Sequence, residues 1–157
     1  MSVYAGLIIR KDWNESTDRD WADVLATLPL FAGIGKRGLR RIAADAEFAE
    51  FLPGDTVVSA RARGDYFYVI LSGRAKAIAK PAARTLEAGD YFGEMSLLDG
   101  EPRSASIVAS EELHVMRLAR RAFDAALERH PSISRSFLKE LGTRVRVLER
   151  QAAQRTP

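Results

Sequence analysis

The spacing of hydrophobic residues changes twice along this chain and divides it into three blocks. From residue 18 to residue 46, apolar side chains recur every three to four positions, as they do on one face of a helix. From residue 47 to residue 118 the spacing falls to about two, which is typical of half-buried strands. From residue 119 onward the helical spacing returns. The pattern therefore predicts helices, then a block of strands, then helices.

Two helices are predicted before the strands. The first covers residues 18–28 and ends before Pro29, because the residue that precedes a proline avoids helical geometry. The second covers residues 38–46. Residues 1–17 carry no regular pattern, and we treat them as an N-terminal extension. The apolar residues that define the two helix faces are Trp21, Val24, Leu25, Leu28, Leu39 and Ile42.

Short strands separated by turn residues fill the middle block. Turn signals such as Pro53-Gly54-Asp55 and Gly64-Asp65 interrupt it roughly every eight to twelve residues. Short strands at that spacing indicate a small barrel or sandwich. The period-two pattern begins at Glu47, and the strands predicted after it are residues 56–58, 66–71, 74–79, 84–87, 104–109 and 113–118.

Two helices are predicted after the strands, over residues 121–129 and about 132–153. His130-Pro131 separates them, and Ser132 can cap the second. The second helix carries an apolar stripe with the alternating three- and four-residue spacing of a coiled-coil seam. The stripe can pack on the strands of its own chain, the commoner use of so short a stripe, or it can join two copies of the chain. It consists of Leu138, Leu141, Val145, Leu148 and Ala152.

The composition is that of an ordinary globular domain. The chain has 157 residues, of which 46% are hydrophobic and 29% are charged, so it can form one domain with a sizeable core. We assign residues 18–153 to that domain and residues 154–157 to a short tail. The sequence has no apolar run of membrane-spanning length, no signal-peptide pattern and no cysteine. These features indicate a cytoplasmic protein.

Two classes of function are disfavoured by the residues present. The formal net charge of +3 is small, and the basic clusters are not interleaved with aromatic side chains, so nucleic-acid binding is not expected. The two histidines, His114 and His130, have no cysteine or carboxylate pattern beside them. We therefore expect no metal site and no catalytic residue, and we expect that the protein is not an enzyme.

The strongest chemical signal is the run FGEMSLLDGEPRSASI at residues 92–107. Gly93 lets a ligand approach the backbone, and the amides of the turn that follows can face an anion. Arg103 can hold a phosphate through two parallel hydrogen bonds, with the Ser104 hydroxyl beside it. Glu94 only accepts hydrogen bonds, which suits a sugar hydroxyl. Together these residues fit a sugar phosphate.

This run resembles the phosphate-binding cassette of cyclic nucleotide-binding domains, and the resemblance extends from about Leu28 to about Leu148. It implies a mainly β fold with flanking helices. An eight-stranded β-roll, similar to a jelly roll or double-stranded β-helix, would cover about residues 47–118, with helices before it and two helices at about 119–153 after it. The implied ligand is cAMP, with cGMP as the alternative, because Ser104 stands where a threonine tends to accompany cGMP preference. No cofactor is implied.

The resemblance also implies a role for each residue of the run. Arg103 and Ser104 would bind the cyclic phosphate together with the backbone at Gly93 and Met95. Glu94 would bind the ribose 2′-hydroxyl. The resemblance thus implies that Arg103, Ser104 and the backbone at Gly93 and Met95 all contact the same phosphate.

In this family the last helix closes over the base. Counting on from Arg103 without a gap places Arg144 and Leu148 at such lid positions, where Arg144 would contact the purine and Leu148 would cover it. Ligand binding would then be a regulatory signal, read by a protein effector or by a second copy of the chain through the last helix. The alternative is an interaction domain that keeps the fold and binds no ligand.

One position departs from the family pattern. Arg61 stands in a loop where a glycine is usual. If that loop needs a positive φ, Arg61 is strained, because a Cβ atom disfavours the left-handed region.

Overall fold

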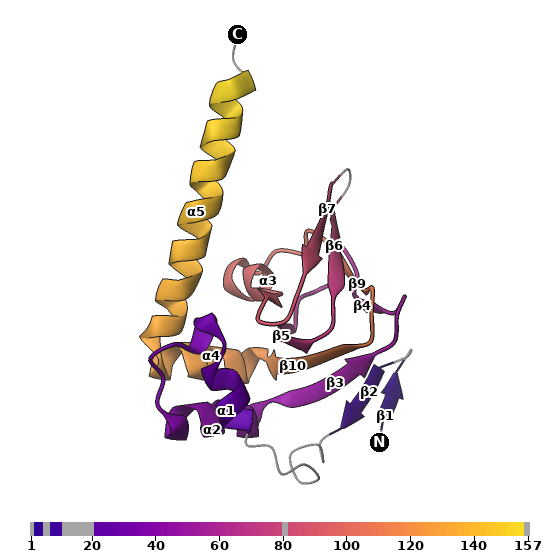
Figure 1. Ribbon diagram of the computed structural model, residues 1–157, viewed down its shortest axis with the longest axis vertical. Coiled ribbons are helices and arrows are strands. Elements are labelled where there is room, and N and C mark those ends of the chain that lie inside the picture. The colour runs from indigo at the N-terminus through magenta and orange to yellow at the C-terminus, as the bar shows by residue number, and fades with distance from the viewer. Residues whose placement is uncertain (1, 5–6, 11–20, 80–81, 156–157) are drawn as a thin grey trace.

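The computed structural model describes residues 2–4, 7–10, 21–79 and 82–155, and it places helices beside two antiparallel sheets (Figure 1). The helices are α1 (Trp21–Ala26), the 3-10 turn η2 (Pro29–Phe31), α2 (Lys36–Asp45), α3 (Glu94–Asp99), α4 (Arg120–Arg129) and α5 (Pro131–Arg155). The strands are β1 (Ser2–Tyr4), β2 (Leu7–Arg10), β3 (Glu47–Phe51), β4 (Thr56–Val58), β5 (Tyr66–Ser72), β6 (Ala75–Ala79), β7 (Ala82–Leu86), β8 (Tyr91–Phe92), β9 (Ser106–Ala109) and β10 (Leu113–Ala119).

The eight strands β3 to β10 form the β-roll that the sequence predicts. One sheet has the order β1-β2-β3-β10-β5-β8, and the other has the order β4-β9-β6-β7. Every strand pair in the described part of the chain is antiparallel. The mainly β fold with flanking helices is therefore confirmed.

The side chains of β5 alternate between two hydrophobic cores. Phe67 and Val69 belong to the core shared with the helices, whereas Tyr68 and Ile70 belong to the core between the two sheets. A strand that is buried on both faces reads as a continuous apolar run, which is what residues 66–71 show. The fold therefore buries the segment that the sequence makes richest in strand-forming residues.

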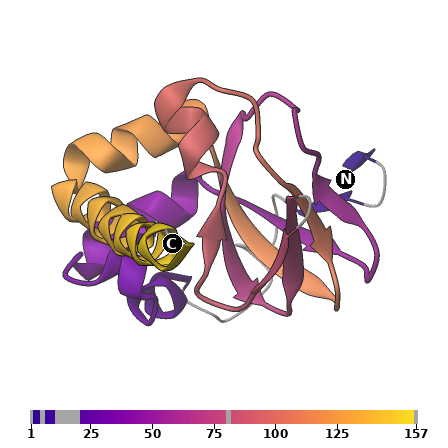
Figure 2. The same cartoon turned by 90° about the horizontal axis from the view of Figure 1, so that it is seen from above.

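The helices are grouped on one side of the β-roll (Figure 2). Phe67 of β5 meets Phe123 of α4 and Phe137 of α5, with ring centroids 5.0 and 5.8 Å apart. Along α5 only Ile133 and Phe137 are buried, and the C-terminal part of this helix extends beyond the other elements (Figure 1). None of the helices in the described part of the chain has the length and hydropathy of a membrane-spanning segment.

The structure corrects some predicted helix boundaries. The second helix starts at Lys36, before the expected residue 38. The last helix starts at Pro131, so Ser132 lies in its first turn and is not its cap, because proline is favoured at the first helical position. Of the first predicted helix, residues 18–20 lie outside the described residues.

Two strands lie in the N-terminal segment, where the sequence shows no regular pattern. β1 and β2 pair with each other, and β2 pairs with β3, so the hairpin extends the first sheet. Strands of only three and four residues are too short to leave a recognisable alternation.

Most of the apolar stripe of the last helix does not pack on the strands, so the prediction that the stripe as a whole would do so is wrong. Leu141 is the exception, because it is half-buried and lines a small pocket with Tyr91 and Glu94. Leu138, Val145 and Leu148 are 67%, 51% and 63% exposed. Phe137, one position before the stripe, makes the contact instead, and its ring lies edge-on against Tyr91 with the centroids 5.1 Å apart. The alternative use of the stripe, to join two copies of the chain, stays a proposal.

Arg61 has a φ of 66°, which makes it the one non-glycine residue with a positive φ in the described part of the chain. The backbone N–H of Arg61 donates to the carbonyl oxygen of Arg103 at 2.8 Å, and the N–H of Arg103 donates to the carbonyl of Ala62 at 3.1 Å. The strained loop is therefore tied directly to the backbone of the candidate phosphate-binding residue.

Replacing Arg61 with glycine is expected to stabilise the fold. Relief of the left-handed strain outweighs the extra freedom of the unfolded chain, so the gain should be about 0.5–1 kcal/mol. Thermal unfolding should show a rise in melting temperature of roughly 1–4 °C. Arg61→Ala is the matched control, because alanine keeps the Cβ atom and hence the strain. Equal melting temperatures for the glycine and alanine variants would contradict this explanation.

Candidate functional site

Gly93 sets the geometry of the site. It has a φ of 91° and lies between β8 and α3. A Cβ atom at this position would lie 2.7 Å from the carbonyl oxygen of Tyr66 and 2.8 Å from Nη1 of Arg103. The absence of a side chain is therefore what lets Arg103 pass behind the start of α3, close to the backbone of β5.

Arg103 is buried, with 8% of its surface exposed. Its Nη2 donates to the carbonyl oxygen of Tyr66 at 3.0 Å, and its guanidinium lies 5.8 Å from the ring centroid of Tyr68. No salt bridge holds the Arg103 guanidinium within the described residues. A buried cation without a paired anion is costly, so this guanidinium is a ready partner for an anionic ligand.

Glu94 is the second buried charged residue of the site, with 7% of its surface exposed. Burial raises the pKa of the Glu94 carboxyl group, whereas a backbone hydrogen bond and the charge of Arg144 oppose the rise. Burial lowers the pKa of Arg103, and electrostatic interactions with Tyr68, Asp65 and Glu94 oppose that change. The two side chains are thus desolvated and close enough to influence each other electrostatically.

One pocket collects most of the residues that the sequence singled out. Six of the seven predicted site residues line it, and five of the six come from the run at 92–107. The exception is Leu148, which does not line the pocket and is 63% exposed on α5. The predicted residues that line the pocket are Gly93, Glu94, Met95, Arg103, Ser104 and Arg144.

The pocket lining that sequence reasoning did not predict includes two large polar side chains. Arg84 comes from β7, and Tyr91 comes from β8 immediately before the run. Arg84 is close enough that its charge lowers the pKa of Glu94. No local motif marks either residue. Arg84 reaches the pocket only because strand pairing brings β7 there.

Arg144 reaches the pocket from α5. Its Nη2 donates to Oε1 of Glu140, one helical turn earlier, at 2.9 Å. The pocket therefore has a floor of strands, a buried arginine and glutamate, and one cationic side chain from the last helix at its edge.

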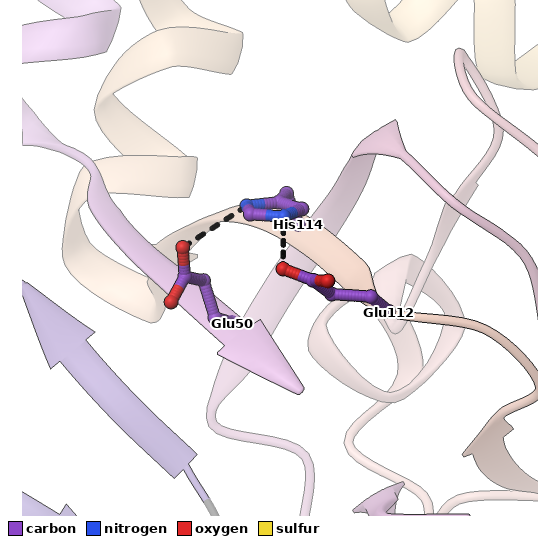
Figure 3. Close-up of side chains that lie close together, drawn as sticks. All are labelled: Glu50, Glu112 and His114. Atoms are coloured by element: carbon purple, nitrogen blue, oxygen red, sulfur yellow. Dashed lines mark hydrogen bonds and ion pairs between the residues drawn. The ribbon is translucent and has the colours of Figure 1, made fainter. Parts of the chain in front are cut away.

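A second group of polar side chains lies away from this pocket (Figure 3). Glu50 on β3 pairs across the sheet with His114 on β10. Nδ1 of His114 is 3.4 Å from Oε1 of Glu50, and Nε2 is 3.3 Å from Oε1 of Glu112. Sequence reasoning overlooked Glu112, which lies only two residues before His114, and it could not place Glu50, which reaches His114 through strand pairing. One ligand atom from each of the three residues lies within 4.8 Å of the others, so the group has the spacing to hold a metal ion. Exposed acidic groups with this spacing are common without an ion, and we assign no function to this group.

The fold and the pocket together define a β-roll domain built around a buried arginine and glutamate. The sequence profile described as "Cyclic nucleotide-binding domain" matches residues 48–130. That is more than half of the chain. The chain therefore belongs to the cyclic nucleotide-binding domain family.

Individual relatives agree with this assignment. The chain is similar to the cAMP-dependent protein kinase regulatory subunit of Aspergillus fumigatus, with 35% identity over 66% of this chain and 26% of that protein. It is also similar to potassium/sodium hyperpolarization-activated cyclic nucleotide-gated channel 3 of Mus musculus, with 31% identity over 85% of this chain and 18% of that protein. The chain thus spans about a quarter or less of the length of these curated relatives.

A solved structure shares the same architecture. The regulatory domain of Toxoplasma gondii PKA in a co-crystal with cAMP superimposes with a TM-score of 0.71 and 25% identity, over 78% of this chain and 49% of that one. By name, the two curated relatives are a regulatory subunit and a cyclic nucleotide-gated channel.

Proposed function

We propose that this chain binds cAMP in the pocket around Arg103 and Glu94. Arg103 and Ser104 hold the cyclic phosphate, together with the backbone at Gly93 and Met95. Glu94 accepts a hydrogen bond from the ribose 2′-hydroxyl. The role of the chain is binding and regulation, without catalysis and without a cofactor.

The observation that carries this proposal is the buried guanidinium of Arg103. It is 8% exposed and, among the described residues, has no salt bridge. Its hydrogen bond to the Tyr66 carbonyl uses one Nη2 donor and fixes its direction. A cyclic phosphate carries one negative charge and two free oxygens, which matches the paired donors that remain on a guanidinium.

Isothermal titration calorimetry with cAMP, cGMP and AMP tests the proposal. We expect one site per chain for cAMP and weaker binding of AMP, whose phosphate is neither cyclic nor singly charged. Absence of binding by both cyclic nucleotides would overturn the proposal. In that case the chain would be an interaction domain that keeps the fold and binds no ligand.

One observation favours cGMP as a second candidate. Arg84 lines the pocket, and a guanidinium only donates hydrogen bonds. Guanine offers two neighbouring acceptors, O6 and N7, whereas adenine offers N7 beside a donor. Ser104 supports cAMP by the family pattern, so the two residues favour different bases. The ratio of the cAMP and cGMP dissociation constants, measured for wild type and for Arg84→Ala, decides between the two nucleotides. If Arg84 contacts guanine, the variant loses affinity for cGMP and keeps its affinity for cAMP.

Glu94→Ala is expected to weaken cAMP binding by about 10- to 100-fold, the range of a hydrogen bond to a charged group. The expected loss is specific to the ribose 2′-hydroxyl. Calorimetry with 2′-deoxy-cAMP checks this, because wild type and variant should bind that ligand almost equally. Glu101→Ala, an exposed glutamate of the same run, is the control. A loss of equal size for both ligands would contradict the assigned role of Glu94.

The regulatory step in this proposal is closure of α5. A ligand that contacts both the β-roll and α5 favours the closed arrangement, so binding shifts the helix toward the pocket. Arg144 contacts the purine and Leu148 covers it in that arrangement. The same coupling requires that anything that favours closure also raises ligand affinity.

The partner that reads this signal binds α5 in the proposed scheme. The exposed stripe of Leu138, Val145 and Leu148 supports a second copy of the chain as that partner. This option competes with the lid role of Leu148, because one side chain cannot both line a contact between two copies and cover the base. A protein kinase catalytic chain is an alternative suggested by the name of the Aspergillus relative. Sedimentation equilibrium with and without cAMP tests the first option, and a monomer under both conditions would exclude it. The proposed location is the cytoplasm.

A further inference from the structure

Glu140 joins α5 to the β-roll and at the same time holds Arg144. Its Oε2 accepts a hydrogen bond from the hydroxyl of Tyr91, and its Oε1 accepts one from Nη2 of Arg144 at 2.9 Å. Tyr91 lies on β8, two residues before Gly93. One carboxylate therefore connects the strand that leads into the phosphate site with the arginine at the edge of the pocket.

The contact lies where α5 leaves the body of the protein. The ring of Phe137 packs edge-on against Tyr91, with the centroids 5.1 Å apart. Beyond Arg144, the large apolar residues Val145 and Leu148 are 51% and 63% exposed. The packing of α5 on the strands thus ends close to the Tyr91–Glu140 hydrogen bond, which is well placed to control how far the helix can move.

The electrostatics of the three side chains support the same arrangement. The pKa of Tyr91 is raised far above its usual value, first by burial and then by the hydrogen bond and charge of Glu140. The hydroxyl therefore stays protonated and remains a donor. Burial raises the pKa of Glu94, and the charge of Glu140 adds to the rise, whereas the positive charge of Arg144 opposes it. Arg144 thus favours the ionised form of Glu94 that accepts hydrogen bonds.

We propose that Tyr91 and Glu140 are positioning residues that bias α5 toward the β-roll, and Arg144 toward Glu94, before any ligand binds. The nucleotide then completes the closure, because Leu148 is still 63% exposed in the ligand-free arrangement. The inference rests on the proposed function, since it says how the same pocket is kept ready for its nucleotide. Without this network, part of the binding free energy would be used to order α5. The apparent affinity would then equal the intrinsic affinity multiplied by the fraction of molecules in which α5 is closed.

Nucleotide affinity of three variants tests the first consequence. Tyr91→Phe removes only the hydroxyl and keeps the ring against Phe137, and Glu140→Ala keeps a strong helix former. Each should raise the cAMP dissociation constant by about five- to tenfold, the order expected for one partly exposed charged hydrogen bond. The double variant should be no worse than Glu140→Ala, because both changes break the same network. Glu149→Ala, an exposed glutamate farther along α5, is the matched control and should bind like wild type.

The position of α5 without ligand tests the second consequence. The chain has no cysteine, so spin labels can be placed on Glu101→Cys and Gln151→Cys without other reactive sites. Wild type should give a narrow distance distribution by pulsed electron spin resonance. Tyr91→Phe and Glu140→Ala should each broaden it, and Glu149→Ala should not.

The two readouts separate the possible failures. If wild type binds neither cAMP nor cGMP, the proposed function fails, and the label distances still decide whether the network holds α5. If wild type binds but the variants match it in affinity and in distance, the inference is overturned. Tighter binding by the variants would also overturn it, because Glu140 would then compete with the ligand for Arg144. Weaker binding with unchanged distances would overturn it as well, because Tyr91 would then act on the ligand directly.

Discussion

Arg103→Leu should weaken cAMP binding severely while leaving the ligand-free fold intact. The variant removes the cationic donor pair that holds the phosphate, and truncation of one partner of a buried charge pair costs about 2–5 kcal/mol. The dissociation constant should therefore rise by about 30- to 4,000-fold. The stability of the free protein should change little, because the loss of the Tyr66 contact is offset by removal of a buried unpaired charge.

Two measurements separate binding from folding in this variant. Calorimetry gives the dissociation constant, and thermal unfolding without ligand gives the stability. Arg63→Leu is the matched control, because Arg63 is an exposed arginine close in the sequence to the loop that bonds the Arg103 backbone. Arg103→Lys keeps the charge but loses the planar donor pair, and it should bind with intermediate affinity. Wild-type affinity in Arg103→Leu would refute the assigned phosphate site.

Gly93→Ala should destabilise the fold and weaken binding together. The new Cβ would lie 2.7 Å from the Tyr66 carbonyl oxygen and 2.8 Å from Nη1 of Arg103, at a φ of 91°. Left-handed strain and the clash with a buried strand should cost about 2–4 kcal/mol in total. The melting temperature should fall by roughly 5–15 °C. The nucleotide should also bind more weakly, because the clash displaces the Arg103 guanidinium.

Alanine substitutions at two other glycines separate the backbone strain of Gly93→Ala from its steric clash. Gly33 has a φ of 83°, and a Cβ added there would meet no atom within 4 Å, so Gly33→Ala measures strain alone and should cost about 1 kcal/mol. Gly142 lies inside α5 with open space around it, so Gly142→Ala should stabilise the helix by about 0.5–1 kcal/mol. A cost at Gly93 no larger than at Gly33 would contradict the close approach of Arg103.

The part of the site that could be predicted from sequence is the part that is contiguous. Gly93, Glu94, Arg103 and Ser104 lie within twelve residues, so a glycine turn and a short helix bring them together without help from distant segments. The strain at Arg61 was also predictable, because a positive φ is a property of one residue and the loop pattern indicated it.

The part that could not be predicted depends on how distant elements pack. Arg84 reaches the pocket through the pairing of β6 with β7 and β9, which no local pattern records. Glu140 was not noticed because its role depends on the direction in which α5 leaves Phe137. Counting residues on from Arg103 gives the position of Leu148 along the helix. The exposure of Leu148, however, depends on how far the helix lies from the strands.

A crystal structure of the chain with cAMP tests the central claim most directly. The account predicts one nucleotide in the pocket, with a phosphate oxygen about 3 Å from each of two Arg103 nitrogens and the ribose 2′-hydroxyl about 2.7 Å from a Glu94 oxygen. A nucleotide bound elsewhere on the chain, or a pocket in which Arg103 and Glu94 make no contact with it, would contradict the account.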